Sequence, residues 1–359
     1  MIKSIRTLTL ITAIAALLAS CGVSDSKTYT LRIGAGHPAG PAVYATQLRD
    51  YFVPEVERRV AEETDFKVQF IEGYGGSIAS TAETLEAVQS GILDIGGYCV
   101  CFEPSKLFLH NFMYFTPFGP QDSVASVKTA RRVYDANPWL EEQLNHDYRQ
   151  RLLALNGWDN YHLGTVNPWT TIEDLRGVKI GGAGPNLPWL EYAGVTPVQS
   201  SLPDGYLSLE TGVYDGWLMF PSAYYSFKFH EPAPHYTLIG FGAMGGAVIV
   251  TMNNKRFNKL PPEVQTIIME VAKDYELKAA QTLDQRQVGG LEDLRGSGAT
   301  VTELAAESRA IWARSLAEFP NAMAQEANSR GMPGTDVMSA YIQEVTQSGH
   351  PWPTEYEIK

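Results

Sequence analysis

The side chains best suited to catalysis are not grouped in this sequence. Its seven histidines, which most readily exchange protons near neutral pH, are scattered and pair with no nearby cysteine or acid. There is no nucleophile elbow and no phosphate-binding loop with its lysine. The glycines of Gly240-Phe-Gly-Ala-Met-Gly245 match a dinucleotide-binding turn, but a strand pattern follows where that turn needs a helix. We therefore expect no enzyme, no metal ion and no cofactor.

The first of the three cysteines, Cys21, ends a stretch typical of a secretory signal. Two basic residues precede an uncharged run over 7–18, which is shorter than the roughly 20 apolar residues that cross a bilayer. Leu18-Ala-Ser-Cys21 resembles the bacterial lipobox, whose cysteine is acylated and becomes the first residue of the mature protein. We expect a lipoprotein signal over 1–20, a tether over 21–27 and lipidation of Cys21. The alternative is an ordinary signal that contains a cysteine by chance.

The other two cysteines, Cys99 and Cys101, fall at the end of a predicted strand. Residues two apart on a strand point to the same face, and so close a pair is poorly placed for a disulfide. No other cysteine and no histidine at metal-ligand spacing lies nearby in the sequence. We therefore interpret both as small core residues.

Composition and length limit the possible partners and the architecture. The 40 acidic residues outnumber the 28 basic ones, and the formal net charge is −12. Such a charge argues against nucleic acids and anionic membrane surfaces as partners. It does not set the sign of a ligand, because a pocket can carry its own charges. The 359 residues exceed what one hydrophobic core usually holds, which predicts two lobes.

Strand and helix patterns alternate along the chain, as in mainly parallel sheets covered by helices. The first such unit has predicted strands at 28–34, 66–71 and 93–100 and helices at 42–63 and 80–90. The second has predicted strands at 178–180, 195–200 and 214–220 and short helices at 187–193 and 205–210. After a strand at 248–250, a helical pattern over 262–294 is too long for one small lobe to cover, so we expect it to lie across both. A strand at 299–304 and helices at 306–329 and 335–347 follow.

Five short motifs occur in order within residues 28–301. They are Gly36-His-Pro38, Leu85-Glu-Ala-Val-Gln-Ser-Gly91 with Asp94, Asn167-Pro168 with Ile172-Glu-Asp-Leu-Arg-Gly-Val-Lys-Ile180, Leu209-Glu-Thr-Gly-Val-Tyr-Asp-Gly216 and Phe257-Asn-Lys-Leu-Pro-Pro-Glu263. Together they resemble the extracytoplasmic solute receptors of tripartite ATP-independent periplasmic (TRAP) transporters, the DctP-like family. The stretch over 172–180 is the most specific of the five.

The resemblance implies an α/β fold of two lobes, joined by crossing strands and by a long helix that spans both. We place 28–152 and about 240–275 in the first lobe, and 153–239 and about 276–359 in the second. Members of this family capture a small solute between hinged lobes and deliver it to TRAP membrane subunits. The expected location is the periplasm of a Gram-negative bacterium, where acylated Cys21 would anchor the protein to a lipid bilayer near its partner.

The sequence departs from the family at the positions that usually bind a carboxylate. The resemblance places an arginine directly after the strand at 178–180, where this chain has Gly181. A second frequent arginine aligns with Asp159, and a third polar contact, an asparagine, aligns with Met219. A carboxylate buried beside Asp159 without a cation would cost several kcal/mol. We therefore expect a receptor that does not bind ordinary dicarboxylates.

Three solute classes stay open. The leading hypothesis is a cationic or neutral polar solute, such as an ethanolamine-like or choline-like amine, held by Asp159 and by aromatic faces through cation–π contacts. The aromatic residues meant are Trp158, Tyr161, Trp169, Trp217 and Tyr98. The first alternative is an aromatic or apolar solute that stacks among these rings. The second is a carboxylate bound in an atypical way, for instance by Arg32.

Topology selects the positions of the site, because ligands of open α/β lobes bind beyond the carboxyl ends of the strands. The predicted ligand-binding residues are His37, Tyr74, Ser77, Tyr98, Trp158, Asp159, Tyr161, Gly181, Trp217 and Met219. Two less favoured functions are a periplasmic enzyme that uses a pair such as His37 and Asp159, and an input protein for a sensor kinase.

Overall fold

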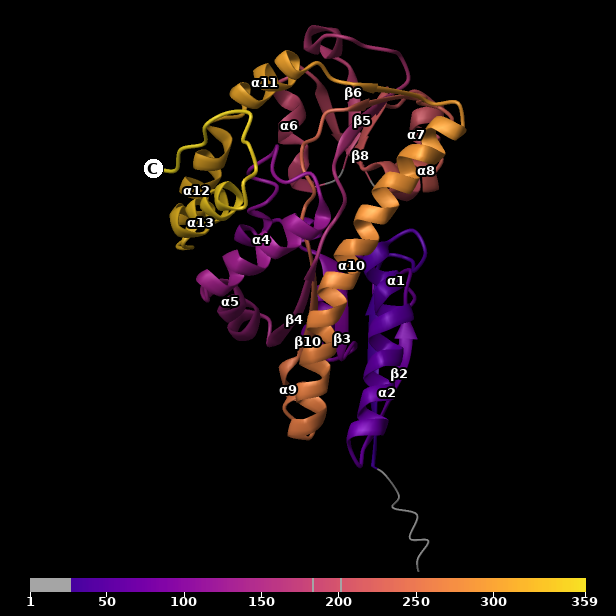
Figure 1. The fold of residues 1–359 in the computed structure, drawn as a ribbon, viewed down its shortest axis with the longest axis vertical. Helices are drawn as coiled ribbons and strands as arrows, with labels where there is room; N and C mark the ends of the chain where they lie inside the picture. The colour runs from indigo at the N-terminus through magenta and orange to yellow at the C-terminus, as the bar shows by residue number, and fades with distance from the viewer. Residues whose placement is uncertain (1–26, 183, 201) are drawn as a thin grey trace, which may run out of the picture.

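The computed structural model describes residues 27–182, 184–200 and 202–359. The predicted signal and Cys21 lie outside these residues, so both stay predictions. No helix in the described ranges has the length and apolar composition needed to cross a membrane. Two sheets with their covering helices form two lobes, the second above the first in Figure 1. The expected two-lobed α/β fold is confirmed.

The first lobe is built on a five-stranded sheet with the strand order β2-β1-β3-β10-β4. Its strands are β1 (Thr28–Ala35), β2 (Lys67–Gly73), β3 (Ile95–Cys99), β4 (Gln150–Asn156) and β10 (Val248–Asn253). β1 is parallel to β2 and β3, whereas β10 returns from the second lobe and is antiparallel to β3 and β4. Every residue of β3 and β10 is buried, because these strands lie inside the sheet under helices on both faces.

Helices of the first lobe depart from the sequence pattern in three ways. The predicted helix over 42–63 is divided into α1 (Val43–Gln47), a π-helical turn η1 (Leu48–Phe52) and α2 (Val53–Glu63). The predicted helix at 80–90 forms only over α3 (Thr84–Ser90), which ends at Gly91 in a left-handed conformation. Two further helices, α4 (Ser123–Ala136) and α5 (Trp139–Asp147), occur where no element was predicted.

A buried carboxylate, Asp94, joins the start of β3 to two other elements. It accepts hydrogen bonds from the backbone N–H of Arg32, at 2.8 Å, and from the guanidinium of the same residue. Arg256 of α9 (Asn254–Phe257) approaches the other oxygen at 2.8 Å. Arg32 is therefore engaged with Asp94, which argues against the suggestion that it binds a solute carboxylate.

The second lobe is built on a six-stranded sheet with the strand order β11-β9-β5-β8-β6-β7. Its strands are β5 (His162–Thr165), β6 (Lys179–Gly182), β7 (Thr196–Gln199), β8 (Gly216–Met219), β9 (His235–Leu238) and β11 (Thr300–Glu303). The helices α6 (Pro188–Glu191), α7 (Leu202–Glu210) and α8 (Pro221–Ser226) connect the strands of this lobe. β6, β7 and β8 are parallel, as the second predicted unit requires.

Two chain segments cross between the lobes side by side, over 157–161 and 240–247. Their backbones are hydrogen-bonded, for instance from Met244 N–H to the Trp158 carbonyl at 2.9 Å. They approach so closely that a methyl group at Gly157 would stand 2.1 Å from the Met244 carbonyl oxygen. Glycine is required at this position because any side chain would collide with the backbone of the other segment.

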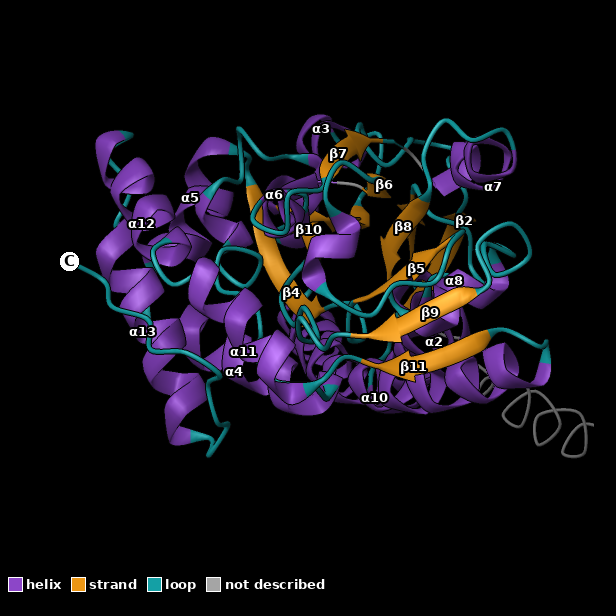
Figure 2. Cartoon of the chain, turned by 90° about the horizontal axis from the view of Figure 1, so that it is seen from above, coloured by secondary structure: helices purple, strands orange, loops and turns teal. Residues whose placement is uncertain are grey.

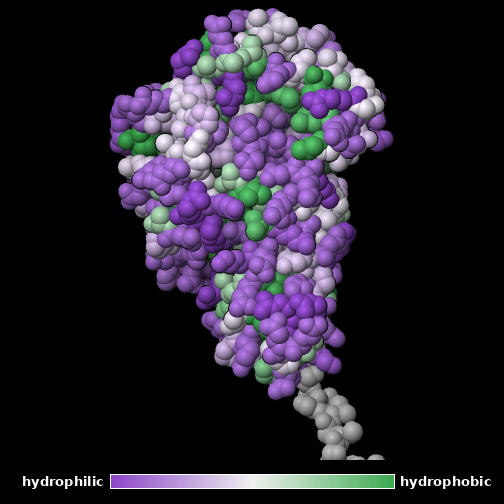
Figure 3. Space-filling view, in the orientation of Figure 1, coloured by the Kyte–Doolittle hydropathy of each residue, from purple (hydrophilic) through white to green (hydrophobic). Residues whose placement is uncertain are grey.

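The long helix α10 (Pro262–Gly296) spans both lobes, as expected (Figure 1). It packs on β4 and α4 of the first lobe and on α8 and β11 of the second. Figure 3 shows the face that carries this helix as mostly hydrophilic, with small separate hydrophobic patches. Leu277 and Val288 are the large hydrophobic residues that α10 exposes.

The C-terminal helices are α11 (Ala306–Ser315), α12 (Phe319–Ser329) and α13 (Gly334–Gln347), and Figure 2 shows α12 and α13 at one side of the sheets. Together these helices contact both lobes. Trp312 of α11 donates from its indole nitrogen to the carbonyl of Trp189 in the second lobe, at 2.8 Å. α13 packs on α4, where Glu344 pairs with Arg132. The expected boundary placed 276–359 with the second lobe, whereas α13 lies on the first. The reason is its apolar face, including Val337 and Tyr341, which α4 and its neighbours bury.

Candidate functional site

A cavity of about 420 Å³ lies where the two lobes and the first crossing segment meet. The first lobe lines it with Gly36, His37, Pro38, Pro41, Ala42, Gly75, Gly76, Ser80, Thr81, Cys101 and Phe102. The crossing segment contributes Trp158 and Tyr161. The second lobe contributes Asn186, Leu202, Trp217, Leu218, Met219, Phe220, Ala223 and Phe227. Its volume suits a small organic molecule.

Aromatic rings form much of the wall. Trp158 stacks on Phe220 with ring centroids 5.5 Å apart and an interplanar angle of 13°. Tyr161 meets the same phenyl ring edge-on at 5.4 Å. The wall therefore joins the crossing segment to the end of β8, and its rings hold one another in defined orientations.

His37 stands in the loop after β1 and adds a neutral ring to this wall. Its Nδ1 lies 3.0 Å from the hydroxyl of Tyr44, and its ring centroid is 5.6 Å from those of both Trp158 and Phe102. Burial lowers the pKa of His37 to about 4, so the imidazole is uncharged at neutral pH. It can offer a hydrogen bond but no positive charge.

No lysine, arginine, aspartate or glutamate lines this cavity in the part of the chain that the structure describes. Its strongest polar feature is the side-chain amide of Asn186, whose Oδ1 is buried and has no hydrogen-bond partner among the described residues. The indole nitrogen of Trp217 is buried without a partner as well. A buried polar group without a partner is costly, so these two side chains are candidates to meet polar atoms of a solute.

Asp159 lies behind the aromatic wall and does not line the cavity. It is fully buried, and its Oδ2 accepts a hydrogen bond from the hydroxyl of Ser222 in α8, at 3.0 Å. Burial raises the pKa of Asp159 to about 7, with the Ser222 hydroxyl opposing that rise. Trp158 and Tyr161 line the cavity, whereas the carboxylate of Asp159 points to Ser222 of α8. The prediction that Asp159 contacts a solute directly is not met by this geometry.

Replacing Asp159 by asparagine should remove one pH dependence of stability. The folded carboxyl ionises near pH 7 and an unfolded one near 3.8, so the folded chain holds its proton more tightly between these values. The contribution of Asp159 to the free energy of unfolding therefore falls as pH rises from about 4 to 7, by up to ~1.4 kcal/mol per pH unit. Urea unfolding of wild type and Asp159→Asn at pH 5 and pH 8 checks this. The variant should gain stability relative to wild type at pH 8, and an unchanged difference would contradict the buried carboxyl.

Five of the ten predicted site residues are brought together at the cavity: His37, Trp158, Tyr161, Trp217 and Met219. That they bind the solute stays a proposal. The suggested catalytic pair of His37 and Asp159 is not formed, because the imidazole bonds Tyr44 and the carboxyl bonds Ser222. Nothing in the geometry supports an acid–base pair at this site.

Four other predicted residues lie elsewhere. Tyr98 is a core residue whose hydroxyl donates to Gln150 at 2.8 Å, and Ser77 is exposed outside the cavity. Tyr74 is half-buried next to the lining glycines but does not line the cavity. Gly181 leaves no room for a ligand, because a methyl group there would stand 2.6 Å from the Trp217 ring. The indole thus fills the space in which a side chain at 181 would begin.

Sequence reasoning missed Phe102, Asn186, Phe220, Ala223 and Phe227. Phe102 and Asn186 follow predicted strands by a few residues, so the rule that selected His37 could have found them. Phe220, Ala223 and Phe227 follow β8 in the same way. The aromatic character of the phenylalanines alone gave no signal, since aromatic residues are common in cores.

The structure corrects the interpretation of Cys99 and Cys101, which form a disulfide with Cα atoms 5.1 Å apart. The expectation assumed a straight strand, but β3 ends at Cys99 and a 3₁₀ turn, η2 (Val100–Phe102), follows. The turn brings the two sulfur atoms together. Both residues are buried, as expected.

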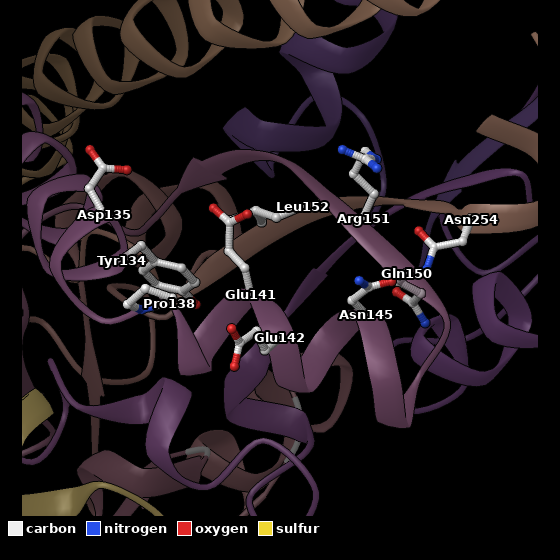
Figure 4. Close-up of a pocket in the computed structure, with 10 residues that line it drawn as sticks. All are labelled: Tyr134, Asp135, Pro138, Glu141, Glu142, Asn145, Gln150, Arg151, Leu152 and Asn254. Atoms are coloured by element: carbon white, nitrogen blue, oxygen red, sulfur yellow. Dashed lines mark hydrogen bonds between the residues drawn. The ribbon is translucent and has the colours of Figure 1, made fainter. Parts of the chain in front are cut away.

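A second cavity of about 400 Å³ lies on the surface of the first lobe, around α5 and β4. Figure 4 shows the carboxylates of Asp135, Glu141 and Glu142 toward one end and Arg151 and Asn254 toward the other. It receives no residue from the second lobe or from the crossing segments. The cavity between the lobes is therefore the candidate binding site.

Known proteins resemble this chain in sequence. The family model DctP, described as "Bacterial extracellular solute-binding protein, family 7", matches residues 49–326. The C4-dicarboxylate-binding periplasmic protein DctP of Rhodobacter capsulatus is 31% identical over 183 residues, which are 48% of this chain and 53% of the relative. The matched part thus spans about half the length of that relative.

Solved structures share the fold. A TRAP solute-binding protein from an unidentified marine microbe, specific for aromatic acids and solved with 3-hydroxybenzoate, has a TM-score of 0.78 and 20% identity, covering 90% of this chain and 99% of its own. A protein from Sulfitobacter sp. NAS-14.1, solved with β-D-galacturonate, has a TM-score of 0.73 and 19% identity, covering 88% and 100%. At these identities the similarity shows that the two-lobed architecture is shared.

Proposed function

Because this chain belongs to the DctP family of bacterial extracellular solute-binding proteins, we propose that it is a TRAP transporter receptor for an uncharged solute with an aromatic or apolar body. The observation that carries this proposal is a cavity walled by aromatic rings and lined by no charged side chain among the described residues. The receptor would hold the solute between its lobes, deliver it to membrane subunits and leave its covalent bonds unchanged.

A carboxylate solute is disfavoured by the same wall. The solved relatives named above hold organic acids, but here no arginine or lysine lines the cavity in the described residues. The ring of Trp217 fills the space beside Gly181, where the family arginine would begin. A carboxylate buried without a cation would cost several kcal/mol.

An amine is a second candidate, supported by the buried Asp159 behind Trp158 and Tyr161. An ammonium group against these rings would gain cation–π energy and would favour the ionised form of the carboxyl. Affinity for an amine should therefore rise as pH increases through about 7, the pKa of Asp159. An uncharged solute should bind with no such dependence.

Calorimetry of the purified protein with benzamide, benzylamine and benzoate tests the proposal, because these probes share one ring and differ in charge. Benzamide is expected to bind best. Asn186→Leu should weaken benzamide binding by about tenfold, the value of one lost hydrogen bond in a buried site. The exposed Asn258→Leu serves as a matched control. Binding of benzoate alone would overturn the proposal, and binding of benzylamine alone would favour the amine.

We also propose that acylated Cys21 anchors the receptor to a membrane beside its transporter subunits. The support is the lipobox-like Leu18-Ala-Ser-Cys21 and the polar stretch after it. Cell fractionation of wild type and Cys21→Ser checks this. Wild type should sediment with membranes and extract only with detergent, whereas the variant should not carry the lipid. Equal fractionation would contradict the anchor.

A further inference from the structure

The disulfide between Cys99 and Cys101 closes a tight loop in the wall of the candidate site. Cys99 ends β3, and Cys101 belongs to the turn η2, so one covalent bond fixes the exit of the chain from the sheet. Both Cys101 and Phe102 line the cavity. The bond therefore restrains residues that would touch a solute.

The same loop contacts two further residues of the wall, Trp158 and His37. The indole nitrogen of Trp158 donates to the sulfur of Cys99 at 3.4 Å, which couples the crossing segment to the disulfide. Phe102, the next residue in the turn, packs against His37 with ring centroids 5.6 Å apart. The orientations of two further wall residues, from two other segments, thus depend on this loop.

The loop also touches the second lobe. A methyl group at Gly184 would stand 3.2 Å from the Cys101 carbonyl oxygen and 3.3 Å from the Cys101 Cβ. Gly184 opens the turn η5 (Gly184–Asn186), which carries the candidate polar contact Asn186. The disulfide loop is therefore a point at which the lobes meet beside the cavity.

We propose that the Cys99–Cys101 disulfide is a positioning element of the binding site, and that solute affinity depends on its oxidation state. The inference rests on the proposed function in so far as the cavity between the lobes binds the solute. A dithiol such as dithiothreitol reduces the bond: it gives two electrons and two protons, the S–S bond breaks, two thiols form, and the dithiol becomes a cyclic disulfide. The loop over 99–102 then regains backbone freedom that a solute must remove again on binding.

Binding of the uncharged aromatic fluorophore N-phenyl-1-naphthylamine tests this on purified protein, oxidised or reduced, with the thiols released counted by a colorimetric reagent. Reduction should weaken binding by at least about fivefold, which corresponds to re-ordering about one residue of backbone. The double variant with Cys99→Ser and Cys101→Ser should match reduced protein, and reoxidation should restore affinity only in wild type. Release of two thiols with unchanged affinity would overturn the proposal.

A spectroscopic readout separates positioning from general stability. A disulfide in contact with an indole quenches its fluorescence, so reduction should raise the emission of Trp158. The rise should be absent from Trp158→Phe and present in Trp352→Phe, which lies outside the cavity. A rise of equal size in both variants would mean that Trp158 is not held by the disulfide and would contradict the proposal.

If the fluorophore does not bind at all, hydrogen exchange still tests the role of the disulfide. That result would count against the proposed aromatic solute, not against the role of the disulfide. Amides over 157–161 should then still exchange faster after reduction, because the Cys99 sulfur that accepts from Trp158 is no longer fixed by a closed loop. Unchanged exchange in this segment after complete reduction would overturn the inference whatever the solute proves to be.

Discussion

Trp158→Ala should lower affinity for an uncharged aromatic solute by about a hundredfold. Trp158 joins three other segments at the wall: it stacks on Phe220, meets His37 edge-on and bonds the sulfur of Cys99. Losing one face of the indole removes roughly 100 Å² of apolar contact, which is worth ~2.5 kcal/mol at about 25 cal/mol per Å². Calorimetry with benzamide measures the change.

Two controls separate this loss from a loss of fold. Trp158→Phe keeps an aromatic face without the indole nitrogen and should stay within about tenfold of wild type. Trp352→Ala removes a half-buried tryptophan that packs on Tyr356 away from the cavity, and it should leave affinity unchanged. If Trp158→Ala melts cooperatively and binds like wild type, the cavity between the lobes is not the binding site.

Asp94→Ala should have the largest effect on stability, lowering the free energy of unfolding by about 2–4 kcal/mol. The carboxylate has no exposed surface and binds the backbone and side chain of Arg32 together with the side chain of Arg256. Its loss leaves a buried backbone N–H without an acceptor. The two arginine side chains are about 40% exposed and can turn to water, so the cost stays below that of a fully buried ion pair.

Urea unfolding of Asp94→Ala and of a surface control gives the measurement. The exposed Asp65→Asn should change stability by less than about 0.5 kcal/mol. Asp94→Asn keeps the shape and loses the charge, so it should fall between wild type and Asp94→Ala. Equal stability of wild type, Asp94→Asn and Asp94→Ala would show that the Asp94 carboxylate does not hold β1, β3 and α9 together.

Much of the fold could be predicted from the sequence because its elements follow strong local rules. Strands at 28–34 and 248–250 and the long helix at 262–294 appear within a few residues of the expected bounds. The segment over 101–177 carried no predicted element, yet it forms α4, α5, β4 and β5. β4 and β5 pair with strands of the two sheets, α5 packs on β4, and α4 packs on α10 and α13. Most of these contacts join segments far apart in the sequence, which no local pattern encodes.

Half of the predicted site residues line the cavity, and geometry explains why the others do not. Strand order locates the loops that surround a cleft but not the direction of each side chain within a loop. Trp158 and Asp159 are neighbours, yet one faces the cavity and the other faces α8. The disulfide escaped prediction for a related reason, because it depends on where β3 stops and η2 begins.

The C-terminal segment links the two lobes by hydrogen bonds behind the cleft. Arg309 donates to the carbonyls of Ile239 and Gly240 at the entrance of the second crossing segment, while Tyr356 donates to the carbonyl of Pro117 in the first lobe. Any rotation of one lobe against the other must therefore distort this segment or break its hydrogen bonds. Hydrogen bonds far from the cavity therefore resist rotation of one lobe of the receptor against the other.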